Sequence, residues 1–257
     1  QLNSSLSRLP PTISLNLLGI KENPICSPLT LNPDRCRTLS DVLYHGGNSA
    51  VCRQQAGVQL KNFLYTNDES LRAQYEDRWL NIPEDVRVYT KQNVVGALGT
   101  ESFRPSAAAQ CVHMIAVVEI PRGCWPGLIT TLVGNVTNPA STEMTKESTL
   151  QAIGYVCQDV EHRFLEESAN EILTAIVHGM RRDETSSQVR LAATRALNNS
   201  LEFTKANFDK DAERHYIMQV RPSQMYVLHG HKWLTCRWFV RLHSRRTVRS
   251  KLPPFSA

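Results

Sequence analysis

The sequence predicts an all-α fold, an α-solenoid built from antiparallel helix pairs. Its middle part places apolar residues three or four positions apart, which is the period of a helix. Helix pairs recur at about 40–45 residues, the period typical of HEAT repeats. Each pair can bury its apolar face only against its neighbours, so we expect a right-handed superhelix, truncated at both ends. The second helix of each pair is rich in alanine; these helices are expected at residues 50–60, 106–118, 145–156 and 187–197.

The clearest helix pair lies at residues 168–203. In SANEILTAIVHGM, Ser168 and Glu171 match the capping box that marks the start of a helix. After a short polar turn, SSQVRLAATRALNNSLEF repeats the same periodicity. Apolar residues at helical spacing follow the capping box: Ile172, Leu173, Ile176, Val177 and Met180.

A second pair lies just upstream, in CWPGLITTLVGNVTNP and STEMTKESTLQAIGYVCQDV. We expect Trp125-Pro126 to begin its first helix and Asn138-Pro139 to end it, because proline fits the first turn of a helix and disfavours helix in the residue before it. An irregular helical bundle is the alternative interpretation of the same periodicity.

Composition divides the chain into three segments. Residues 1–38 are rich in Pro, Ser and Asn and have no sustained period, which indicates disorder. Residues 39–220 form the helical body and carry more acidic than basic residues. Residues 221–257 carry eight Lys or Arg and no Asp or Glu, without a periodic apolar face, so this basic tail is also expected to be disordered.

The composition and the apolar runs of the chain disfavour several classes of protein. No apolar run approaches the ~18 residues of a membrane-spanning helix. The start of the chain lacks a Met and the features of a signal peptide, which favours a piece of a longer protein or a translated gene model. Seven Cys form no CxxC pair, which favours a reducing compartment.

Enzymatic function is not expected, and neither is a cofactor or a resident metal. Cys111 and His113 are two positions apart in one apolar helix, so they point to different faces and cannot meet as nucleophile and base. His229 and His231 provide two metal ligands without a third. The chain has no P-loop and no GxSxG motif.

Four stretches resemble the importin beta family of nuclear import receptors. They are GTESFRPSAAAQCV, NVTNPASTEMTKESTLQAIGYVCQDV, NEILTAIVHGMR and LAATRALNNSLEFTKANFDKDAERHYIMQ. The resemblance extends from about Leu39 to Val220. It implies the end of the first HEAT repeat through the first helix of the sixth, in a receptor found in the cytoplasm, the nucleus and the nuclear pore complex.

The resemblance implies a binding site for the phenylalanine of FG-repeat nucleoporins. In the family, the outward helices of two adjacent repeats form this groove, and Leu173, Val177, Glu213 and Tyr216 match its positions. Tyr216 departs from the phenylalanine that the family pattern leads us to expect. Its hydroxyl needs water or a partner, so we expect reduced rather than lost binding.

The resemblance also implies a surface for the GTPase Ran in its GTP form, on the inner helices of the first repeats. Lys61 and Gln110 are candidate contact positions, although solvated side chains without a partner are equally compatible with the sequence. Because most of the first repeat is not matched, weakened Ran binding is expected. The later repeats that wrap the importin-α arm are not matched either, so binding of that arm is not expected.

Two alternatives concern the ends of the chain. The basic tail interleaves Trp233 and Trp238 with arginines, a composition that could bind nucleic acid non-specifically. Alternatively, the resemblance stops at Val220 because the tail is read from an intron, and the chain is a non-functional product of an importin beta gene.

Overall fold

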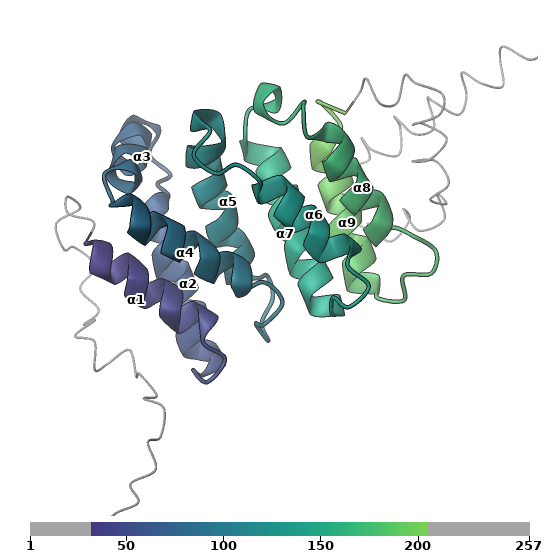
Figure 1. Ribbon diagram of the computed structural model, residues 1–257, viewed down its shortest axis with the longest axis horizontal. Helices are drawn as coiled ribbons and strands as arrows, with labels where there is room; N and C mark the ends of the chain where they lie inside the picture. Colours follow the sequence, from purple (N-terminus) through teal and green to yellow (C-terminus); the bar gives the residue numbers. More distant parts are fainter. Residues whose placement is uncertain (1–31, 205–257) are drawn as a thin grey trace, which may run out of the picture. The chain divides into compact units, whose positions relative to one another are not determined.

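A computed structural model describes residues 32–204, and these residues form helices joined by turns (Figure 1). Glu213 and Tyr216, the basic tail 221–257 and most of the first segment, 1–31, lie outside the described residues. Within the described range the helical prediction is confirmed, and the array matches the HEAT solenoid in architecture.

The described residues hold four helix pairs and one additional helix, α3, between the first two pairs. The pairs are α1 (Pro33–Tyr44) with α2 (Ala50–Leu64), α4 (Glu84–Gly96) with α5 (Ala107–Glu119), α6 (Leu128–Thr137) with α7 (Glu143–Asp159), and α8 (Ala169–Gly179) with α9 (Ser187–Ser200); α3 spans Arg72–Leu80, and single 3₁₀ turns lie at η2 (Glu69–Leu71), η3 (Ile120–Arg122) and η4 (His162–Phe164).

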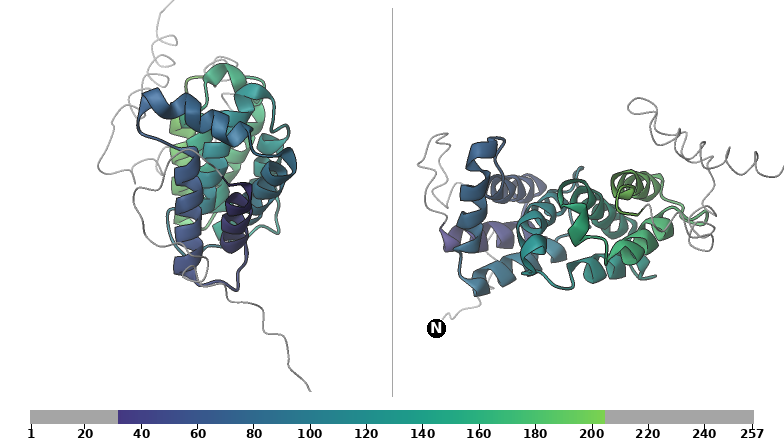
Figure 2. Two further views of the ribbon diagram at one scale, coloured as in Figure 1. Left: turned by 90° about the vertical axis from the view of Figure 1, so that its left-hand side faces the viewer. Right: turned by 90° about the horizontal axis from the view of Figure 1, so that it is seen from above.

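The pairs form two layers of helices. The second helices pack side by side in the order α2, α5, α7 and α9, and we call them the inner layer. The first helices α1, α4, α6 and α8 form the outer layer, in which α1 packs on α4 and α6 on α8. Both layers are visible when the array is turned (Figure 2). All four alanine-rich helices expected from the sequence belong to the inner layer.

Alanine and glycine are needed in the inner layer because its helices approach closely. A Cβ atom added to Gly57 of α2 would lie 2.6 Å from the Cβ atom of Ala107 in α5. Between α7 and α9, a Cβ on Gly154 would lie 3.3 Å from the Cα atom of Ala196. Larger side chains at these positions would separate the helices, so the composition of the second helices fixes the spacing of the layer.

Ser and Thr side chains begin every inner helix. The hydroxyl oxygens of Ser49, Ser106, Thr142 and Ser186 accept hydrogen bonds from the third backbone N–H of α2, α5, α7 and α9. Helix α1 is capped in the same way by Asn32, whose Oδ1 accepts from Asp34 N at 2.9 Å. With Pro33 at its first position, α1 begins ahead of the boundary expected at Leu39.

Two expected helix starts differ from the structure. The capping box at α8 is wrong: Ser168 has φ −93° and ψ 5°, and its side chain makes no capping hydrogen bond. The η4 turn before α8 keeps Ser168 out of the extended conformation that a capping residue needs. The Glu171 carboxylate does not reach back to Ser168 but accepts a hydrogen bond from the hydroxyl of Thr130. Helix α6 begins at Leu128 rather than at Trp125-Pro126, after Gly127 with φ 76°, and it ends before Asn138 as expected.

Candidate binding surfaces

Helix α8 carries the described part of the expected FG-binding site. Its seven buried residues occupy most of its circumference, and Asn170 and Thr174 form an exposed stripe. Leu173 and Val177 lie beside this stripe and are 5% exposed each. They therefore sit at the border between the core and the outer surface.

One hydrogen bond fixes which side of α8 faces α6. Thr130 of α6 donates from Oγ1 to Glu171 Oε2 at 2.9 Å. Since a helix turns about 100° per residue, Leu173 and Val177 lie about 160° and 120° around α8 from Glu171. These two side chains are thus on the flank of α8 that faces away from α6. In a solenoid, that flank is directed toward the repeat that follows.

Lys61 and Gln110 lie in the inner layer at the contact between α2 and α5, and both are partly exposed. Lys61 follows Gly57 by one helical turn, and Gln110 is one turn from Ala107, the residue that Gly57 approaches. The Sγ atom of Cys111 donates to the carbonyl oxygen of Gly57 at 3.2 Å across the same contact. Neither Lys61 nor Gln110 uses its side chain in a hydrogen bond to another residue of the described range.

Cys111 and His113 have different partners, as their spacing predicts. His113 Nε2 lies 2.8 Å from Asp159 Oδ2 on α7, and this close polar contact with the imidazole lowers the pKa of Asp159. Burial raises the pKa of the Cys111 thiol. The two side chains do not form a nucleophile–base pair. Residues 32–204 also contain no cluster of His, Cys, Asp and Glu that could hold a metal ion, and no helix among them is long and apolar enough to cross a bilayer.

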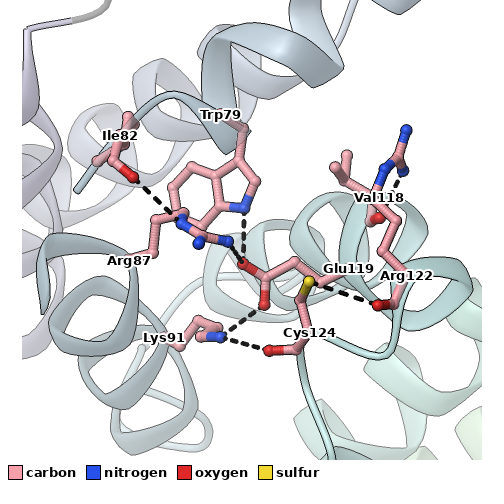
Figure 3. Close-up of polar contacts among 8 residues, drawn as sticks. All are labelled: Trp79, Ile82, Arg87, Lys91, Val118, Glu119, Arg122 and Cys124. Carbon is pink, nitrogen blue, oxygen red and sulfur yellow. Dashed lines mark hydrogen bonds and ion pairs between the residues drawn. The ribbon is translucent and has the colours of Figure 1, made fainter. Parts of the chain in front are cut away.

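A buried charged cluster around Glu119 was not expected from the sequence (Figure 3). The Glu119 carboxylate is fully buried at the end of α5. Its Oε1 accepts hydrogen bonds from Trp79 Nε1 of α3 and Arg87 Nη1 of α4, both at 2.9 Å. Its Oε2 accepts from Lys91 Nζ of α4 at 2.5 Å. The only sequence signal for this cluster is an acidic residue at the end of an otherwise apolar helix.

The cluster has a structural role in tying α3, α4 and α5 together. Lys91 Nζ also donates to the carbonyl oxygen of Cys124 at 3.1 Å and lies 5.4 Å from the centroid of the Trp125 ring. Every charged group in the cluster therefore has a partner within the protein, with the two cations sharing one carboxylate. A buried carboxylate with these partners is satisfied and offers no open site for a ligand.

A second polar network connects α1, α2 and the start of α5. Arg53 donates from Nε to Leu43 O at 2.8 Å and from Nη1 to Thr100 O at 2.6 Å. The neighbouring Glu101 carboxylate accepts from Ser106 and from the backbone N–H groups of α5, and burial raises its pKa. For Arg53, burial has the opposite effect and lowers the pKa, because it disfavours the charged form of each group. This network orders the α4–α5 connection.

The chain is similar in sequence to importin subunit beta-1 proteins of fungi and a plant, and no protein-family model matches it. Identity to the Schizosaccharomyces pombe protein is 37% over 183 residues, covering 71% of this chain and 21% of that protein. Identity to the Saccharomyces cerevisiae protein is 38% over 185 residues, which covers 70% of this chain and 21% of that protein. Identity to the Arabidopsis thaliana protein is 38% over 172 residues, which covers 65% of this chain and 19% of that protein. The chain thus spans about a fifth of the length of the curated relatives it matches.

Solved structures give the same relationship. Yeast importin-beta, Kap95p, superimposes with a TM-score of 0.67 at 36% identity, covering 73% of this chain and 22% of that one. The same receptor in a Kap95:Nup1 complex gives a TM-score of 0.63, and in a structure with RanGDP 0.65, each at 36% identity and the same coverage.

Proposed function

Because the chain belongs to the importin beta family, we propose that it acts in nuclear transport by docking on FG-repeat nucleoporins through the outer surface of α8. The observation that supports this proposal is the position of Leu173 and Val177 on the flank of α8 that faces away from α6. The structure of Kap95 with Nup1 supports a nucleoporin as the kind of partner. Glu213 and Tyr216 complete the proposed site through the family resemblance.

The chemistry of an apolar helix flank suits a phenylalanine side chain. Burying one such side chain gives about 1.5–3 kcal/mol, while association costs at least about 4 kcal/mol. One phenylalanine side chain does not offset this cost, so a single FG contact is very weak. Useful affinity arises when many repeats of one nucleoporin bind in turn, which raises the effective concentration of the next repeat.

We also propose that Ran in its GTP form binds the inner layer near Lys61 and Gln110. Two features support this surface. Both side chains are partly exposed at one helix–helix contact, and neither is used in a hydrogen bond to the rest of the described chain. The structure of Kap95p with RanGDP supports the kind of partner. Replacing Lys61 by glutamate is expected to weaken binding of Ran, measured by calorimetry, and to leave FG binding unchanged.

Binding of the full chain to an immobilised multivalent FG-repeat fragment tests the nucleoporin proposal. Val177→Asp places a charge on the proposed site and is expected to reduce the apparent affinity by at least about tenfold, since about 1.4 kcal/mol corresponds to that factor. Thr174→Asp introduces the same charge on the exposed stripe of the same helix and is the matched control. We expect this control variant to bind like the parent.

A milder variant separates loss of binding from loss of folding. Val177→Thr replaces a methyl group by a hydroxyl, which within a helix can donate to a carbonyl oxygen of the preceding turn. The helix content measured by circular dichroism is therefore expected to stay unchanged while binding weakens. Equal reduction by Val177→Asp and Thr174→Asp would contradict the assigned site. So would failure of the well-folded parent to bind.

A further inference from the structure

Helix α2 lies at one end of the inner layer, and one of its sides is not covered by the described residues. It packs on α1 and α5, and α3 crosses one of its ends (Figure 2). Three apolar residues on the uncovered side are spaced by seven positions: Val51, Val58 and Tyr65. Val51 is 67% exposed, Tyr65 is 42% exposed, and Val58 between them is partly exposed. Because seven residues make nearly two helical turns, these side chains form one stripe about 21 Å long, which we call the α2 stripe.

The contacts of α2 show that the array uses other sides of this helix. Gly57 faces α5, since a Cβ atom added to it would lie 2.6 Å from a Cβ atom of that helix. Gln59 faces α1, because its Oε1 accepts a hydrogen bond from Arg35 Nη2 at 3.3 Å. Val58 lies between these two residues, about 100° around the helix from each, and it is roughly opposite the fully buried Leu60. The α2 stripe therefore points away from the core of its own repeat.

The side chains beside the α2 stripe are nearly all uncharged. Gln54, Gln55 and Asn62 lie within about 60° of it and carry amides. Lys61 is the only charged side chain there, and no acidic residue accompanies it. Burial of this side would remove apolar area from water without desolvating more than one charge.

We infer that α2 is a contact between two copies of this chain, which pack their α2 stripes against each other in antiparallel orientation. A two-fold axis then passes beside Val58, which meets Val58 of the second copy. Val51 of each copy meets Tyr65 of the other, so the smaller side chain lies opposite the larger one. Each copy thereby buries the exposed apolar area of the other.

Charge selects the antiparallel orientation. In that orientation, residue numbers that lie opposite each other are symmetric about 58, so Lys61 faces the amide of Gln55, and Gln54 faces Asn62. In a parallel pair, each Lys61 would face the other Lys61, and two like charges at a helix contact repel.

The dimer is expected to be weak and to affect the proposed Ran surface. A single pair of helices buries less than the roughly 1,200 Å² of a stable interface, so the dimer dissociates on dilution. Lys61 also belongs to the surface proposed for Ran, and a second copy on α2 covers it. Ran and the second copy would then exclude each other; this consequence rests on the proposed Ran surface, whereas the dimer itself does not.

Sedimentation of the full chain from about 1 µM to 1 mM tests the dimer, since a weak contact requires the upper part of this range. We expect the mean mass to rise toward that of two chains. Val58→Asp places two carboxylates face to face at the axis and is expected to raise the dissociation constant at least about tenfold. Val88→Asp puts the same charge on an exposed valine of α4 and should dimerise like the parent. A parent that stays monomeric throughout, or equal effects of the two substitutions, would overturn the inference.

Two substitutions of Gln55 test the orientation without touching the core, because this residue is exposed. Opposite Lys61 of the second copy, Gln55→Glu is expected to tighten the dimer about fivefold, and Gln55→Lys to weaken it by a similar factor. Circular dichroism should show unchanged helix content in both. In a parallel pair each new charge would face its own counterpart, so both substitutions would weaken the dimer. Weakening by both, or no change in either, would overturn the antiparallel pairing.

Discussion

Replacing Glu119 by glutamine tests how strongly the buried charged cluster stabilises the array. Glutamine keeps nearly the same shape but removes the negative charge that compensates Arg87 and Lys91. Both cations are mostly buried, with side-chain exposures of 14% and 11%. They would keep the cost of desolvation and lose the partner that offsets it.

The expected loss of stability follows from this burial. Removing one partner of a buried ion pair costs about 3–5 kcal/mol. For a domain of this size, each kcal/mol corresponds to a shift of about 2–4 °C in Tm, so we expect a decrease of roughly 6–20 °C. The free energy of unfolding would be measured by urea titration followed by circular dichroism, and Tm by thermal melting.

An exposed ion pair provides the matched control for Glu119. Arg122 Nη2 lies 2.7 Å from Glu76 Oε2, with both side chains partly exposed. Glu76→Gln is therefore expected to change the free energy of unfolding by at most about 1 kcal/mol. A loss of less than about 1 kcal/mol in Glu119→Gln, equal to the control, would refute the reasoning that burial makes this cluster important.

Two further predictions concern packing and pH. Gly57→Ala is expected to destabilise the protein by about 1–3 kcal/mol, because its Cβ would overlap with Ala107. Gly134→Ala, with open space around the same atom, should stabilise it by about 0.5–1 kcal/mol in the same denaturation assay. The nearby His113 imidazole holds the pKa of Asp159 below its ordinary value, so the contribution of Asp159 to stability is present above the unfolded-state pKa and is lost as pH falls through the lower, folded-state pKa. Asp159→Asn should therefore flatten this acid part of the stability–pH curve, and an unchanged curve would contradict the assignment.

Much of the fold could be predicted because repeat solenoids depend on local pattern. The alanine-rich inner helices followed from a period of about 40–45 residues, and the close approach at Gly57 and Gly154 explains why those helices need small residues. Helix α8 was predicted from its apolar spacing, but the cap at Ser168 was wrong. The backbone angles of Ser168 are set by the turn that precedes it. The four-residue capping-box motif contains no information about that turn.

The parts that could not be predicted depend on contacts far apart in the sequence. Glu119 of α5 binds Trp79 of α3 and Arg87 and Lys91 of α4. The residues next to Glu119 in the sequence do not indicate these partners. For the binding positions, apolar spacing alone placed Leu173 and Val177 on a helix, and only the bond between Thr130 and Glu171 orients them away from α6.

Photo-crosslinking with an FG-repeat peptide tests the central claim most directly. The peptide carries a photoreactive benzoyl group on its phenylalanine, and mass spectrometry identifies the crosslinked residues of the full chain. The account predicts crosslinks on the flank of α8 that holds Leu173 and Val177, lost on competition with unlabelled FG peptide. Crosslinks confined to the inner helices α2, α5, α7 and α9 would contradict it.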